Sequence, residues 1–164
     1  MPNKYDDLLQ MLMDVKDEDT GEQMSDRQLR DECMTIFLAG HETTALALTW
    51  LWYLLDQNPT EIDKLRAEAE EVLQGRDPEV GDVMRLEYTR MAIEEAMRLY
   101  PPAWVIGRRN VTEDEIGGYR VPKGYNLLIP VYHIHRDPKI WDDPETFSPE
   151  RFRKGNLKEK HRFA

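Results

Sequence analysis

One stretch, residues 25–57, constrains the fold more than any other part of the chain. It opens with Ser25 and Gln28 at capping-box spacing, where each side chain can satisfy a free backbone N–H of the other residue. It ends before Pro59, because proline disfavours a helical conformation in the residue that precedes it. The stretch therefore predicts a single helix about 50 Å long, at 1.5 Å of rise per residue.

The second half of this predicted helix is apolar on nearly every side. From Ala45 to Leu55 only Thr49 interrupts the apolar residues. A helix that is hydrophobic all round is normally buried, so we expect this segment to lie in the core. It is too short to cross a bilayer, which takes about 20 residues.

Just before this segment, one face of the helix carries small and hydroxyl side chains. Spaced at about 100° per residue, the residues on or beside this face are Ala39, Gly40, Thr43, Thr44 and Ala47. One interpretation is a close helix crossing, with the threonine hydroxyls bonded to their own backbone. The other is a distorted helix that passes over a flat ligand, with Glu42 and a hydroxyl placed to handle protons. The pattern alone leaves both open.

Composition narrows the class of protein. A chain of 164 residues with 40% hydrophobic and 33% charged residues is long enough for one globular domain. Its net charge of −10 argues against a nucleic-acid partner, since such a protein must neutralise phosphates. The single cysteine, Cys33, excludes a disulfide framework and is expected to be a small core residue. The polar first ten residues show no targeting signal, so we expect a soluble cytoplasmic chain.

The rest of the sequence predicts further helices followed by a small β region. The fold class we expect is mainly α with a small antiparallel β-sheet, in a single partial domain over residues 1–164. A proline-punctuated stretch holds a fixed path only where side chains tie it down. The expected segments are helices at 59–74 and 88–100, a β region at 105–132 with strands at 105–111, 116–121 and 125–132, an irregular stretch at 133–152, and a tail at 153–164.

A second group of charged residues lies toward the end of the chain. Glu95 and Arg98 are three residues apart on one face of the 88–100 helix, and Arg151 follows in the sequence Pro-Glu-Arg-Phe at 149–152. By itself, such a helical pair is most often exposed and stabilises a helix by about 0.2–0.5 kcal/mol.

Three motifs, taken in order, resemble those of the cytochrome P450 family. Residues 39–44, Ala-Gly-His-Glu-Thr-Thr, resemble the oxygen-binding motif of the long helix. Residues 95–98 match the family's E-x-x-R helix, and residues 149–152 match its P-E-R-F segment. The hairpin at 117–124 and the stretch at 135–141 also fit, so the resemblance covers essentially the whole chain. It implies a partial P450 fold around one long helix, with haem as cofactor.

The resemblance also implies roles for particular residues. Ala39 and Gly40 correspond to the helix positions beside the haem, and Glu42 and Thr43 to the acid–alcohol pair that delivers protons during dioxygen activation. Thr43 would therefore also lie in the cofactor contact. The remaining implied roles are a locking triad of Glu95, Arg98 and Arg151, a haem-propionate arginine at Arg109 with Arg108 as the alternative, and substrate-side positions at His41 and Ile106. A buried triad of this kind must be fully paired.

One expected feature of the family is missing. Its haem iron is held by a cysteine thiolate, which lies in a glycine-rich loop after the P-E-R-F segment, and the sequence to Ala164 contains no such cysteine. Cys33 lies ten residues from Thr43, about 15 Å along the helix, and cannot substitute. We therefore expect an internal fragment with no metal ligand, which does not retain haem, is inactive alone, and exposes part of the 45–55 surface so that the chain associates.

The expected function is that of a fragment of a haem-thiolate monooxygenase. The complete enzyme would insert one oxygen atom of dioxygen into a small organic substrate, with electrons from a flavoprotein or a ferredoxin. No membrane segment is expected in this chain, and an anchor in a preceding part stays open. The alternative is a non-catalytic helical interaction module that degenerated from such an enzyme. A peroxide-using haem enzyme is disfavoured, because it does not need the Glu42–Thr43 relay.

Overall fold

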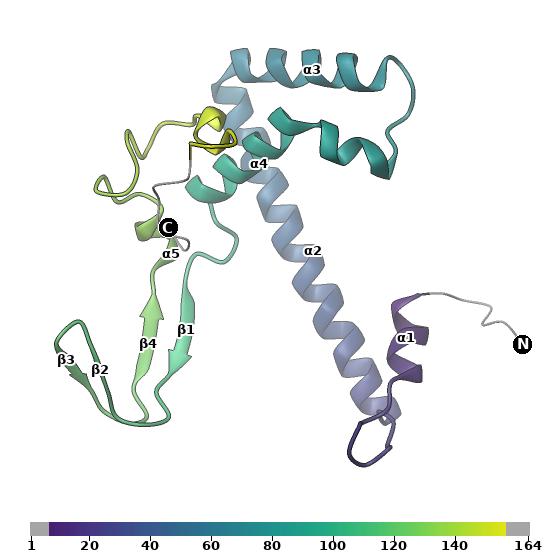
Figure 1. The fold of residues 1–164 in the computed structure, drawn as a ribbon, viewed down its shortest axis with the longest axis vertical. Helices are drawn as coiled ribbons and strands as arrows, with labels where there is room; N and C mark the ends of the chain where they lie inside the picture. Colours follow the sequence, from purple (N-terminus) through teal and green to yellow (C-terminus); the bar gives the residue numbers. More distant parts are fainter. Residues whose placement is uncertain (1–6, 157–164) are drawn as a thin grey trace, which may run out of the picture. The chain divides into compact units, whose positions relative to one another are not determined.

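The computed structural model describes residues 7–156 and is mainly helical, with a small antiparallel β component, as the sequence predicts (Figure 1). Contacts divide the chain into two compact units that meet between Thr44 and Ala45, within the long helix. The single domain expected over residues 1–164 stays a prediction. In order, the elements are α1 (Leu8–Asp14), α2 (Asp26–Gln57), α3 (Pro59–Leu73), η1 (Val80–Arg85), α4 (Glu87–Leu99), β1 (Ile106–Arg109), β2 (Asp114–Ile116), β3 (Tyr119–Val121), β4 (Asn126–Ile129), α5 (Val131–Ile134) and η2 (Pro149–Phe152).

The long helix α2 begins and ends where the sequence predicts. The backbone N–H of Ser25 donates to the Gln28 side chain at 3.1 Å, and the N–H of Gln28 donates to Ser25 Oγ at 3.4 Å. These two bonds form the capping box. At the other end, Pro59 begins α3 directly after Asn58. No helix in residues 7–156 is both long and apolar enough to cross a membrane.

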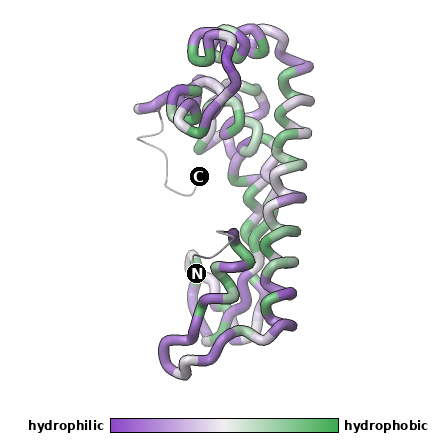
Figure 2. Tube along the Cα trace, turned by 90° about the vertical axis from the view of Figure 1, so that its right-hand side faces the viewer, coloured by the Kyte–Doolittle hydropathy of each residue, from purple (hydrophilic) through white to green (hydrophobic). Residues whose placement is uncertain are grey.

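The prediction that the apolar part of α2 is buried is wrong for most of it. Only Leu51, Leu54 and Leu55 are buried, whereas Trp52 is 66% exposed. Figure 2 shows that hydrophobic stretches recur along α2. The cause is that the neighbouring helices and the residue Phe147 cover only one side of its last turns. The expectation that part of this surface stays exposed is therefore confirmed, and the expected association stays a prediction.

Helix α4 packs into the core through one face. Its buried residues recur at helical spacing: Met91, Ala92, Glu95, Ala96, Arg98 and Leu99. The Glu68 carboxylate of α3 accepts hydrogen bonds from the backbone N–H groups of Tyr88 at 2.5 Å and Thr89 at 2.8 Å. These groups have no partner within the first turn of the helix, so Glu68 supplies the missing acceptor and fixes the start of α4.

The connection between α3 and α4 is held by a second buried carboxylate. Asp82 in η1 is 4% exposed and accepts from two Arg76 nitrogens at 2.7 and 2.5 Å and from the Glu79 backbone N–H at 2.8 Å. The Arg76 hydrogen bonds hold the pKa of Asp82 well below its usual range. The loop therefore has a defined path between the two helices.

The β region forms two separate two-stranded antiparallel sheets. β1 pairs with β4, with Ile106 opposite Ile129 and Arg109 opposite Asn126, and β2 pairs with β3. The single strand predicted at 116–121 is wrong, since Gly117 and Gly118 take φ of 58° and 84° and turn the chain between β2 and β3. Two residues with positive φ form the tight hairpin turn that suits strand twist.

The predicted strand at 125–132 ends earlier than expected. β4 stops at Ile129, and α5 begins after Pro130, whose nitrogen carries no hydrogen for a strand ladder. From His135 to Ser148 the chain has no regular element, as the sequence predicts, and η2 follows. Of the tail expected at 153–164, residues 157–164 lie outside the described part.

Candidate functional site

Glu95 is the centre of a buried charge network. Its side chain is completely buried, and Arg98 donates to it from Nε at 2.7 Å and from Nη2 at 2.9 Å. The backbone N–H of Ser148 donates at 2.8 Å and Arg151 Nε at 3.2 Å. A buried carboxylate is tolerated when it is paired and hydrogen-bonded in this way. The alternative of an exposed Glu95–Arg98 pair is therefore wrong.

Arg98 has an acceptor for each of its five N–H donors. Besides the two bonds to Glu95, Nη1 donates to the carbonyl oxygens of His135 and Pro144, both at 2.7 Å. Nη2 donates to the Thr146 carbonyl at 3.3 Å. The guanidinium carbon also lies 5.1 Å from the centre of the Trp141 ring. Since a guanidinium has five donors in a fixed plane, this one residue attaches α4 to the irregular segment at three points.

Arg151 extends the network to η2. Its Nη1 donates to the Asp142 carbonyl and its Nη2 to the Asp143 carbonyl at 2.7 Å. Asp143 has a φ of 42°, a left-handed conformation that residues with a side chain rarely adopt. The structure thus brings together Glu95, Arg98 and Arg151, and the network holds a turn in an unusual conformation.

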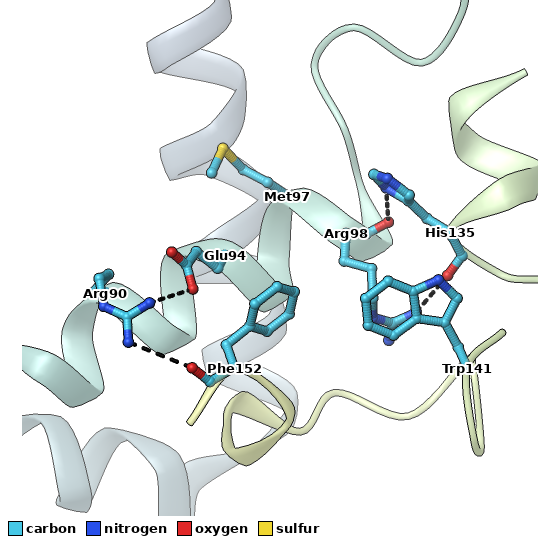
Figure 3. A pocket seen from close by; sticks show the side chains of 7 residues that line it. All are labelled: Arg90, Glu94, Met97, Arg98, His135, Trp141 and Phe152. Atoms are coloured by element: carbon cyan, nitrogen blue, oxygen red, sulfur yellow. Dashed lines mark hydrogen bonds and ion pairs between the residues drawn. The ribbon is translucent and has the colours of Figure 1, made fainter. Parts of the chain in front are cut away.

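A pocket of about 350 Å³ lies beside this network (Figure 3). The charged side chains at its edge are already paired, since Arg90 Nη1 lies 2.6 Å from Glu94 and Arg90 Nη2 donates to the Phe152 carbonyl at 3.4 Å. Apolar walls with paired charges leave little to orient a small polar ligand. The residues that line the pocket are Arg90, Glu94, Met97, Arg98, His135, Trp141 and Phe152.

His135 and Arg98 bind each other reciprocally at this pocket. The His135 ring nitrogen Nδ1 lies 3.2 Å from the Arg98 carbonyl oxygen, and donates to it when Nδ1 carries the proton. Arg98 in turn donates to the His135 carbonyl. Burial lowers the pKa of His135, and the positive charges of Arg98 and Arg136 act in the same direction. The neutral imidazole is therefore the form that suits this position.

The motif at residues 39–44 is exposed, in contrast to the buried network around Glu95. Thr43 Oγ1 donates to the Ala39 carbonyl at 2.6 Å, and α2 continues through Gly40 without a break. A Cβ atom built on Gly40 would meet no described atom within 4 Å. Among residues 7–44, no other helix therefore packs tightly against this face at Gly40. Glu42 and Thr44 are exposed there as well.

Other predicted site residues lie at the surface. His41 stacks on Phe37 at 5.6 Å between ring centres. Arg108 and Arg109 are exposed on β1, where Arg108 Nη1 donates to the Gly107 carbonyl at 2.9 Å. Cys33, expected in the core, is only half-buried. Residues 7–156 hold no cluster of three or more His, Cys, Asp or Glu side chains that could bind a metal ion.

The sequence analysis did not name the partners that complete the network. They are the His135 and Trp141 side chains and the backbone groups of His135, Asp142, Asp143, Pro144, Thr146 and Ser148. A usable signal was present, because an irregular stretch leaves carbonyl oxygens without ladder partners. Arginine is the side chain best able to bind several of them together.

Comparison with known proteins places these features in a family. The family model described as Cytochrome P450 matches residues 2–164. Cyclooctatin synthase from Streptomyces melanosporofaciens is 46% identical over 93% of this chain and 33% of its own length. From the same organism, cyclooctat-9-en-7-ol 5-monooxygenase is 39% identical over 98% of this chain and 35% of its own length. Protein LUTEIN DEFICIENT 5, chloroplastic, from Arabidopsis thaliana is 42% identical over 81% of this chain and 22% of its own length.

The chain thus spans about a third or less of the length of these relatives. The family match nevertheless extends over all of the motifs, from the α2 stretch to the network around Glu95. The chain belongs to the cytochrome P450 family.

Proposed function

We propose that the complete protein is a haem-thiolate monooxygenase that inserts one oxygen atom of dioxygen into a small organic substrate. The observation that supports this most is the match of the family model described as Cytochrome P450 to residues 2–164, which extends over all three motifs. The buried network of Glu95, Arg98 and Arg151 supplies the scaffold, since such a network stabilises only when every charge finds a partner. When bound, haem would supply the redox chemistry that activates dioxygen.

The described residues fit this cofactor in part. In the first unit, a Cβ built on Gly40 would meet nothing within 4 Å, so a flat ring system would find room at this residue. In the second unit, Arg109 and Arg108 are exposed on β1, and either would pair with an anionic group such as a propionate. The axial ligand does not fit, since the only cysteine is Cys33 on α2, ten residues before Thr43. We therefore propose that the 164-residue chain alone does not hold a thiolate-bound haem and does not oxidise substrates. A haem titration of the chain that yields a thiolate-type spectrum would contradict this.

Within the complete protein, Thr43 and Glu42 would move protons. Thr43 Oγ1 donates to the Ala39 carbonyl at 2.6 Å, and its lone pairs can accept a hydrogen bond from a proton donor. To pass a proton onward, the hydroxyl would turn its O–H away from that carbonyl. Glu42 is exposed and can exchange protons with solvent. A hydroxyl relay next to a carboxylate that reaches water is what proton delivery into an apolar pocket requires.

Substrate and electron donor are also proposals. One relative is named for the oxidation of cyclooctat-9-en-7-ol, and an unsaturated alcohol of that kind is the first substrate to test. The electron donor would be a flavoprotein or a ferredoxin. The negative charge of the chain supports the absence of a nucleic-acid partner. A cytoplasmic location stays a proposal, and one relative is named as chloroplastic.

A chimera tests the proposed activity. In the chimera, this chain replaces the matching segment of cyclooctatin synthase. The chimeric protein is then reduced and treated with carbon monoxide. We expect a thiolate-type absorbance band, and its absence in a folded chimera would overturn the proposal. In the chimera, Thr43→Ala should raise the ratio of released peroxide to oxidised product by about tenfold or more. Thr49→Ala is the matched control, since Thr49 makes the same bond to the Ala45 carbonyl at 2.8 Å.

The second candidate function is a non-catalytic interaction module. It is supported by the exposed apolar side chains of α2, among them Phe37 at 61% and Trp52 at 66%. In such a module, Thr43→Ala and Thr49→Ala would both leave partner binding unchanged, and the chimera would carry no haem band. The two candidates are therefore separated by the same chimera.

A further inference from the structure

Outside the network around Glu95, a further arginine, Arg136, is largely removed from solvent. The Arg136 side chain is 10% exposed, and its Nε lies 3.0 Å from the exposed Glu145 carboxylate. Its Nη1 is buried and has no hydrogen-bond partner among residues 7–156. A buried donor without an acceptor is unfavourable, and a charged one more so, so other groups must compensate.

Aromatic rings supply this compensation. The guanidinium carbon of Arg136 lies 3.8 Å from the centre of the Tyr132 ring and 5.4 Å from that of Tyr100. Cations are attracted to the faces of aromatic rings, most strongly where water is excluded. Tyr100 also stacks on Trp50, with 4.1 Å between ring centres and an interplanar angle of 8°. Because the Trp50 indole covers one face of the Tyr100 ring, we take Arg136 to approach the opposite face.

These four side chains form what we name the aromatic–arginine stack: Trp50, Tyr100, Arg136 and Tyr132. They come from different elements, since Trp50 is on α2, Tyr100 ends α4, Tyr132 is in α5 and Arg136 follows it. The stack therefore joins α5 to the end of α4 and to the last part of α2.

Strand β4 leads directly into α5 (Figure 1). The backbone N–H of Tyr132 also donates to the Trp104 carbonyl at 3.1 Å, just before β1. Neither β1 nor β4 contributes a buried side chain in the described part of the chain. The two strands have no core of their own, so their place depends on the segments at their ends. One of those ends is the stack.

We infer that Arg136 is a positioning residue that, through the aromatic–arginine stack, holds the β1–β4 strand pair on the helical core. That pair carries Arg108 and Arg109, so the stack also sets where these two arginines lie. That Arg108 or Arg109 pairs with a haem propionate rests on the proposed function. That Arg136 positions the β1–β4 strand pair does not rest on it.

Hydrogen exchange in the 164-residue chain tests the positioning. In Arg136→Met, the backbone amides of β1 and β4 should exchange about tenfold faster, whereas the α4 amides keep their protection. The matched control is Arg120→Met, which removes a 74% exposed arginine paired with Glu113 and should change these rates less than about twofold. Unchanged β1 and β4 rates in Arg136→Met would overturn the inference.

Two further variants keep this test decisive if Arg136→Met fails to fold. Arg136→Lys keeps the charge and loses the planar face, so it should give a smaller acceleration in the same amides. Tyr132→Leu removes the ring closest to the guanidinium and should reproduce the effect of Arg136→Met. If both leave the β1 and β4 amides at their original rates, the inference is wrong.

A mutant cycle tests whether the stack acts as one unit. Trp50 and Arg136 each contact Tyr100, so Trp50→Leu and Arg136→Met should couple by about threefold in the unfolding equilibrium constant, through that ring. The coupling should vanish in a Tyr100→Leu background. Additive effects in the presence of Tyr100 would mean separate contacts and would contradict a single stack.

The chimera separates this inference from the proposed function. If it binds haem, Arg136→Met should speed haem release by about tenfold and Arg120→Met should not. A chimera without haem would overturn the proposed function, and the exchange experiment would still decide on the stack. Faster exchange without faster haem release would sever the link to Arg108 and Arg109.

Discussion

Two polar regions of this chain, the network around Glu95 and the 39–44 stretch of α2, look alike in sequence and differ in their partners. Each places a glutamate on a helix, Glu95 on α4 and Glu42 on α2. In the network, Glu95 accepts hydrogen bonds from Arg98, Arg151 and a backbone amide, and is completely buried. In the α2 stretch, Thr43 bonds only to its own helix and Gly40 faces open space among residues 7–156.

The difference separates two uses of polar groups. A network whose donors and acceptors all find partners within the chain holds the backbone in place and offers nothing to a ligand. A helix face without partners contributes little to stability and remains accessible. Charge alone therefore does not identify a functional site. What matters is whether the polar groups already have hydrogen-bond partners within the chain. Substitutions in the two regions should therefore differ in their effect on the stability of the chain.

The largest effect is expected for Glu95→Gln. It leaves Arg98 buried without its counter-charge, so the free energy of unfolding should fall by about 3–5 kcal/mol. Chemical denaturation followed by circular dichroism measures the change. The control is the next residue, Glu94→Gln, whose partner Arg90 is half-exposed, and it should lower stability by less than about 1 kcal/mol. Equal losses in the two variants would contradict the contrast.

The second-largest loss in the free energy of unfolding is expected for Arg98→Lys. Lysine keeps the charge but has three donors on a single nitrogen, so the carbonyls of His135, Pro144 and Thr146 lose most of their bonds. We expect a loss of about 2 kcal/mol in the free energy of unfolding. Arg108→Lys, at an exposed arginine on β1, should stay within about 0.5 kcal/mol. A similar small change for Arg98→Lys would show that charge alone holds the network.

Trp52→Lys should reduce association of the chain. Trp52 is 66% exposed on the apolar part of α2, and exposed apolar patches promote association. Sedimentation should show the chain moving toward its monomer mass of 19.4 kDa, with a dissociation constant about tenfold weaker. Tyr119→Lys, at a 79% exposed residue of β3, is the control. A clean monomer of the unchanged chain would remove the basis for this prediction.

Acid should weaken the network through His135. Burial lowers the pKa of His135 in the folded chain relative to its ordinary value of 6.5, so the unfolded chain binds the proton more readily. Its contribution to stability is therefore present above pH 6.5 and is lost as pH falls below that value toward the lowered pKa. Unfolding free energies measured across this range should decline less steeply in His135→Asn. A slope unchanged by the substitution would exclude His135 as the cause.

The smallest effect is expected for Thr43→Ala. The lost hydroxyl bond is exposed, and alanine favours a helix, so stability should change by no more than about 0.5 kcal/mol. Thr49→Ala removes the same kind of bond and should behave alike in thermal unfolding. A loss above about 1 kcal/mol for Thr43→Ala alone would mean that this face has a structural partner after all.

The sequence contains the three motifs and correctly predicted both ends of α2. The prediction that the apolar part of α2 is buried was wrong for most of it. Helix ends depend on residues three or four apart, such as Ser25 and Gln28, and these interactions are local. Burial of Trp52 depends on which other segment covers it, and no local pattern contains that information. The turn at Gly117 and Gly118 was missed for a different reason, because the two short strands on either side of it looked like one.

The long capped helix, the order of the family motifs and the need for an anchored path through residues 133–152 follow from the order of residues along the chain. Which acceptors Arg98 takes, which rings Arg136 meets and which side of α2 is covered follow from the folded structure. The acceptors of Arg98 in the irregular segment lie 37 to 48 residues away along the chain. Such contacts depend on how distant segments fold back on each other, whereas caps and turns depend on adjacent residues alone.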